Sequence, residues 1–172
     1  MKVKRMVNWL RVQSAGQMGM YGAEELTQWK AMALLYYVQG TYLAMYGVPA
    51  FEDEILIEKN GPVIAAVRQK YHDRIRIVGK LGKKAWADDR LIEDRHPQHL
   101  DVLHAVWQAF GDLSTIELRQ QMLQEAPCQE TKVGQAIDLD RLTAYFQTEV
   151  VAFPETTAAD PVVDAVHADP VS

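Results

Sequence analysis

The sequence predicts a mainly α-helical protein: a compact, single-domain helical bundle around a buried central helix, with at most a small two- or three-stranded β element. Three observations lead to this prediction. The segment 31–46 is apolar on nearly every side, whereas a helix on the surface keeps a polar face toward water. Amphipathic segments with apolar residues three and four positions apart lie before and after it. Only two short β-branched runs, 55–57 and 75–78, suit strands.

The central helix is expected from Glu24 to Tyr46. Two acids at its start suit the positive end of the helix dipole. Gly47 can take the left-handed conformation that ends a helix, and Pro49 cannot continue one. Gln39, a polar residue inside the apolar run, is expected to hydrogen-bond a nearby backbone turn. Four tyrosines of this helix are expected in the core rather than in a binding site: Tyr36, Tyr37, Tyr42 and Tyr46.

An amphipathic first helix is expected before the central one, because Val3, Val7 and Leu10 recur at helical spacing. Three glycines then follow at positions 16, 19 and 22. They predict a mobile or ligand-adapting loop around Met18 and Tyr21 rather than a packed element.

The segment after the central helix combines strand and turn signals. Asn60-Gly61 predicts a turn after the strand 55–57, and Pro62 suits the first position of a third helix, 62–71. A strongly basic block, 68–84, follows, and the strand predicted inside it at 75–78 could pair with 55–57.

Four more helices are expected in the second half of the chain. A short surface helix covers 88–95, and a longer one begins at His96-Pro97 and ends at Gly111. Ser114 and Glu117 have the spacing of a capping box, whose helix Pro127 ends. The last helix begins at Asp138. Residues 154–172 lack aromatic side chains and are expected to form a flexible acidic tail, which leaves 1–153 as the helical domain.

Composition and charge narrow the functional class. A chain of 172 residues can bury one core without a disulfide or metal, and its formal net charge of −5 disfavours a surface built throughout for nucleic acid. Cys128 is the single cysteine, which fits a reducing compartment. The apolar segment is shorter than the roughly 20 residues of a membrane span, and no secretory signal is evident. We expect a cytoplasmic protein without membrane contact.

No residue set predicts catalysis, a cofactor or a metal site. Cys128 has no histidine partner visible in the sequence. His99 and His104 are five residues apart, whereas zinc ligands on one helix usually stand four apart. The run 79–84 lacks the spacer and the hydroxyl residue of a phosphate-binding loop. The sequence therefore predicts a protein that is not an enzyme.

Three short blocks, 34–40, 47–51 and 61–63, keep the order and spacing of a known signature. They resemble the Panacea antitoxin domain, a family that includes SocA-like antitoxins and phage-associated GepA proteins. A second set of blocks, at 110–114, 117–118 and 125–127, is similar to the second motif of that family. The motif residues are Leu35, Tyr36, Gln39, Gly40, Gly61, Pro62 and Val63. Their role, structural or in binding, is left open.

The resemblance implies a prophage-associated antitoxin that neutralises a cognate toxin by direct protein–protein binding. SocA-like relatives suggest an alternative, an adaptor that delivers the toxin to a cytosolic protease. The basic block has three interpretations. It could be a solvated turn, a face for an acidic protein partner, or the surface with which a regulator binds nucleic acid. The residues predicted to contact a partner are Met18, Tyr21, Arg74, Arg76, Lys80, Glu125 and Pro127.

Overall fold

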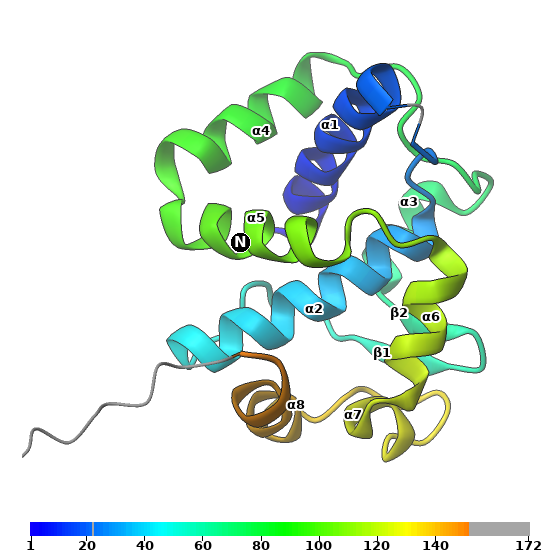
Figure 1. The fold of residues 1–172 in the computed structure, drawn as a ribbon, viewed down its shortest axis with the longest axis vertical. Coiled ribbons are helices and arrows are strands. Elements are labelled where there is room, and N and C mark those ends of the chain that lie inside the picture. Colours follow the sequence, from blue (N-terminus) through cyan, green and yellow to red (C-terminus); the bar gives the residue numbers. More distant parts are fainter. Residues whose placement is uncertain (22, 152–172) are drawn as a thin grey trace, which may run out of the picture.

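Residues 1–21 and 23–151 are described by the computed structural model of the protein, and they form the mainly α-helical fold that the sequence predicts (Figure 1). In chain order the elements are α1 (Val3–Tyr21), α2 (Gln28–Tyr46), β1 (Leu56–Glu58), β2 (Gly61–Val63), α3 (Ala65–Tyr71), α4 (Lys83–Arg95), α5 (Pro97–Phe110), α6 (Thr115–Gln124), α7 (Ala126–Gln129), α8 (Leu139–Tyr145) and the π-helical turn η1 (Phe146–Val150). The predicted tail, 154–172, and the domain boundary before it lie outside the described residues.

Helix α2 is the buried centre of the fold. It crosses the middle of the molecule, with α1, α4 and α5 on one side and the β1–β2 hairpin, α6, α7 and α8 on the other (Figure 1). Every residue from Lys30 to Ala44 is buried, the predicted core tyrosines 36, 37 and 42 among them. A helix surrounded in this way needs no polar face, which is why its apolar residues show no amphipathic pattern. Within residues 1–21 and 23–151, each helix is too short or too polar to span a bilayer.

The start of α2 differs from the prediction. The helix begins at Gln28 rather than Glu24, and the side chain of Thr27 caps it by accepting a hydrogen bond from the backbone N–H of Lys30. The preceding residues are extended because they pair with the segment after α3: the Ile77 N–H donates to the Leu26 carbonyl. The acids therefore lie before the helix. Its end is as predicted, with Gly47 left-handed at φ 70°.

Helix α1 continues through the segment that was predicted to be a loop. Gly16 and Gly19 lie within it, and Met18 is partly buried on it. Each glycine weakens a helix by only about 0.5–1 kcal/mol, which the packing of a long helix can offset. The glycine spacing was therefore misleading, and the predicted loop is wrong.

The β element is a hairpin of β1 and β2, with Ile57 opposite Pro62. Pro62 is therefore in a strand, not at the start of a helix, and α3 begins at Ala65. The pairing tolerates proline because the backbone N–H and carbonyl of Ile57 bond to the segment 134–135 instead, so no N–H is required at position 62. The predicted pairing of 75–78 with 55–57 is wrong, since 75–77 pairs with the residues before α2.

Helix α4 is longer than the predicted surface helix 88–95, and one side of it is buried against α1. Asp88 is buried and accepts hydrogen bonds from Asn8 at 2.7 Å and Arg5 at 3.2 Å. Burial raises the pKa of Asp88, but these bonds and the one from Lys84 outweigh burial and hold it below its usual value. Helix α4 thus carries one of its charged groups, Asp88, in the interior of the protein.

Helix α6 begins at its predicted capping box, and α8 begins at Leu139, one residue after the predicted start. Ser114 and Glu117 form the capping box of α6, and Asp138 caps α8. Pro127 does not end α6, however. That helix ends at Gln124, Glu125 is extended, and Pro127 lies in the first turn of the separate helix α7, where its missing N–H is not needed.

Candidate functional site

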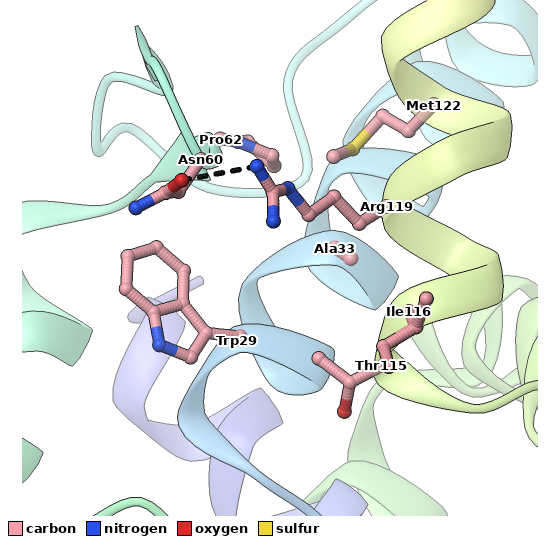
Figure 2. A pocket seen from close by; sticks show the side chains of 8 residues that line it. All are labelled: Trp29, Ala33, Asn60, Pro62, Thr115, Ile116, Arg119 and Met122. Atoms are coloured by element: carbon pink, nitrogen blue, oxygen red, sulfur yellow. Dashed lines mark hydrogen bonds between the residues drawn. The ribbon is translucent and has the colours of Figure 1, made fainter.

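A pocket of about 220 Å³ opens between α2, the β1–β2 hairpin and α6 (Figure 2). Its floor is apolar, with Ala33 and Met122 almost fully buried and Pro62 buried on β2. The side chains that line it are Trp29, Ala33, Asn60, Pro62, Thr115, Ile116, Arg119 and Met122. The pocket is therefore a junction of three elements that are distant in sequence.

Trp29 forms one side of the pocket, across from Ile116 and Thr115 (Figure 2). It is partly buried in the first turn of α2, and the guanidinium carbon of Arg68 lies 5.8 Å from its ring centroid. Arg68 itself donates two hydrogen bonds of 2.8 Å to the carboxylate of Glu58. This fork-to-fork pair fixes the cation beside the indole and neutralises its charge.

Arg119 extends from α6 to the hairpin across the top of the pocket as drawn (Figure 2). It is exposed and donates one hydrogen bond of 3.0 Å to the side-chain oxygen of Asn60, which is a neutral group. Among residues 1–21 and 23–151 no acid lies within ion-pair distance of Arg119. The mouth of the pocket thus carries a positive charge without an internal counter-ion.

Ile116 extends the apolar surface outward from the pocket. It occupies the second position of α6 and is 69% exposed, although isoleucine is usually buried. An apolar floor, an exposed aliphatic rim and one arginine suit a protein contact, because arginine and tryptophan are the residues most enriched where binding energy concentrates. No pair of convergent acids or histidines lines this pocket.

A second group of polar side chains is buried on the other side of α6. Glu125 accepts hydrogen bonds of 2.7 Å from the hydroxyls of Tyr36 and Tyr37, one on each carboxyl oxygen. Burial raises the pKa of both tyrosine hydroxyls. Burial also raises the pKa of Glu125, and the hydrogen bonds it accepts lower it only in part. The cluster joins α2 to the end of α6.

Cys128 lies beside this cluster and is buried. Burial, with a smaller effect from the nearby charge of Glu125, raises the pKa of its thiol to about 12. The thiolate, which is the nucleophilic form, is therefore scarce at neutral pH. This environment gives Cys128 a structural rather than a nucleophilic character.

Replacing Glu125 by glutamine is expected to change how stability depends on pH. The folded protein holds the Glu125 proton more tightly than the unfolded chain, whose carboxyl titrates near 4.5. The contribution of Glu125 to the free energy of unfolding is therefore fully present below that pH. It is lost as pH rises through the higher pKa that Glu125 has in the folded state. The free energy of unfolding of the native protein, minus that of Glu125→Gln, should fall with pH over this window.

Urea unfolding of both proteins at a series of pH values measures this difference. Subtraction removes the opposite trend from Asp88 and Glu117, whose pKa values are lowered in the folded protein. Glu52→Gln makes the same change at an exposed acid in the segment after α2, so it serves as the matched control for substitution without burial. A difference that rises with pH would contradict the expectation.

The residues predicted to contact a partner are not brought together. Arg74, Arg76 and Lys80 are exposed in the segment after α3, whereas Glu125 and Pro127 are buried. Glu125 follows α6, and Pro127 belongs to α7, which lies across α2 from α1 (Figure 1). Tyr21 ends α1. These contacts stay predictions.

The family-motif residues are buried, on α2 or on β2. Gln39 hydrogen-bonds the backbone at Ala50 and Phe51, as expected from its place in an apolar helix. Gly40 lies directly against the ring of Phe146. In this structure, therefore, the motif builds the core, and only Pro62 also reaches the pocket.

Sequence reasoning missed the main pocket residues, Trp29, Asn60, Ile116 and Arg119. The available signal was that residues 116, 119 and 122 are three positions apart and so share one face of a capped helix. That this face lines a pocket depends on α2 and the hairpin opposite it, which only the fold brings there.

The family model described as antitoxin SocA-like, Panacea domain, matches residues 32–127, which is more than half of the chain. The chain therefore belongs to this antitoxin family. The matched range runs from α2 into α7 and contains every residue that lines the pocket except Trp29. No curated protein and no solved structure matches the chain.

Proposed function

We propose that this protein is the antitoxin of a toxin–antitoxin pair and that it neutralises its cognate toxin in the cytoplasm by direct protein–protein binding. Membership of an antitoxin family supports the first part. The single observation that supports direct binding is the pocket with its exposed rim, where Ile116 and Arg119 present an apolar group and an unpaired charge side by side.

The buried polar groups support a binding role rather than a catalytic one. Cys128 is a protonated thiol, and Glu125 is held by two tyrosines inside the core. Neither group faces the apolar pocket that we assign to the partner. Neutralisation would then follow from occupying or distorting the active surface of the toxin, in proportion to the complex formed.

Co-expression in a bacterial host tests the proposal. The product of the gene adjacent to this one is expected to stop growth when induced alone, and this chain should restore growth when both are induced. Binding without degradation also predicts that the toxin level on an immunoblot stays constant while growth recovers. Recovery with loss of the toxin would instead indicate delivery to a protease.

The control is a chain with Pro substituted at Val38, which places proline inside the central helix and should prevent folding. It must fail to restore growth if the folded domain is needed. Absence of rescue by the native chain, with a toxic neighbour, would contradict the proposal.

A further inference from the structure

We infer that the pocket between α2, the hairpin and α6 receives one apolar side chain of the toxin, and that Arg119 pairs with a carboxylate beside that side chain on the same toxin segment. This inference rests on the proposed function and deepens it, because it assigns the toxin-binding site and the chemistry of the segment that occupies it.

The size of the pocket favours a side chain as the occupant. About 220 Å³ is less than the roughly 300–1,000 Å³ of sites that enclose a small molecule or cofactor. The walls are a half-buried indole and an exposed isoleucine, with a buried methionine at depth. An apolar side chain that enters between Trp29 and Ile116 would remove both from water, and such burial is the main favourable term in association.

The charge at the mouth favours an acid next to that side chain. Arg68 already has its counter-ion in Glu58, and Glu117 is held by Ser114 in the capping box. Arg119 has only the neutral side chain of Asn60. A carboxylate from the partner can take two parallel bonds from its guanidinium, which is the geometry arginine favours. The complement is therefore an apolar residue flanked by Asp or Glu.

The positive rim also argues against a second copy of this chain as the occupant through this face alone. If the two-fold axis of such a dimer passed through the mouth of the pocket, the Arg119 side chains of the two copies would lie close together. Like charges placed in that way oppose association. The toxin remains the occupant that satisfies both the apolar and the charged part of the pocket.

Two substitutions test the site by measured affinity for the purified toxin. Ile116→Asp puts a charge at the apolar rim, and Arg119→Glu reverses the charge at the mouth. Each is expected to weaken binding by about tenfold or more. Both positions are exposed, and the acid at position 116 lies in the first turn of α6, where it suits the helix dipole, so both variants should fold. Circular dichroism and thermal unfolding check this.

Matched controls make the same chemical changes elsewhere. Val133→Asp replaces an aliphatic residue that is 71% exposed in the loop before α8, and Arg90→Glu reverses an exposed charge on α4. Both should leave the affinity within about twofold of the native value. If the controls weaken binding as much as the pocket variants, the inference is overturned.

A charge-swap screen identifies the toxin carboxylate. Each surface Asp and Glu of the toxin is changed to Arg in turn and tested against the native chain and Arg119→Glu. We expect one or two neighbouring toxin positions at which the change to Arg weakens binding to the native chain. The same change should raise the affinity for Arg119→Glu by at least about tenfold. If no reversal restores binding, the assigned pairing is wrong.

The outcomes separate this inference from the proposed function. Failure of the native chain to bind the toxin would contradict the proposed function itself. If the native chain binds the toxin tightly and Ile116→Asp and Arg119→Glu bind it equally well, the antitoxin role stands. The assignment of this pocket as the toxin-binding site is then overturned. A native dimer that Ile116→Asp separates, with toxin affinity unchanged, would show that a second copy occupies the pocket and would also overturn it.

Discussion

Gly40→Ala is expected to lower the free energy of unfolding by about 2 kcal/mol or more, because the added methyl group has no space. Gly40 lies in the middle of α2, and a Cβ at this position would overlap the ring of Phe146 on η1. The ring is fully buried and packs against Tyr36 and Tyr37, so it cannot simply rotate away. The helix would have to separate from η1.

Gly16→Ala is the matched control for this substitution. Gly16 is also within a long helix, but a Cβ there meets no atom within 4 Å. Alanine should therefore stabilise α1 by about 0.5–1 kcal/mol, which is the usual advantage of alanine over glycine in a helix. Urea unfolding measures both variants. A stability for Gly40→Ala equal to or above that of the native protein would contradict the close packing.

Gln39→Leu is expected to lower the free energy of unfolding by about 3 kcal/mol or more. The Gln39 side chain is 1% exposed and donates to the carbonyl of Phe51 at 2.9 Å. Its own oxygen accepts from the backbone N–H groups of Ala50 and Phe51. Leucine is apolar and cannot make these bonds, so it leaves three backbone groups buried without a partner, and each such group costs about 1–3 kcal/mol.

Gln120→Leu provides the comparison for this change. Gln120 is exposed on α6, so the same substitution should alter stability by no more than about 0.5 kcal/mol. Chemical denaturation followed by circular dichroism gives both values. Equal stability of Gln39→Leu and Gln120→Leu would show that Gln39 does not hold the turn after α2.

The central helix could be predicted from sequence because its signals are local. An apolar run with no polar face indicates burial whatever surrounds it, and the hydrogen bonds of Gln39 follow from its polarity inside that run. The capping box at Ser114 was predicted for the same reason, since a cap is satisfied by residues three positions away.

The errors concern features that depend on long-range pairing. Leu26 and Thr27 are extended because this segment pairs with 75–77, and nothing near Glu24 indicates this. Pro62 is in a strand because Ile57, its partner across the hairpin, turns its own backbone groups to 134–135. Gly16 and Gly19 remained helical because the loss per glycine is small.

Most of the candidate site could not be predicted from the sequence, because it also depends on contacts between distant segments. The pocket joins Trp29, Asn60 and Arg119 from three elements, and its shape arises only when α6 lies beside α2 and the hairpin. Glu125 was predicted to contact a partner because it belongs to the second motif, and that contact stays a prediction. The structure directs its side chain inward to two tyrosine hydroxyls, an arrangement that sequence distance conceals.

Isothermal titration of the purified toxin with the purified full chain tests the central claim most directly. We predict saturable binding at a fixed stoichiometry, with toxin activity lost in proportion to the complex formed and both effects weakened by Arg119→Glu. Absence of any complex between the folded native chain and a toxin that it neutralises in cells would contradict direct binding as the mechanism.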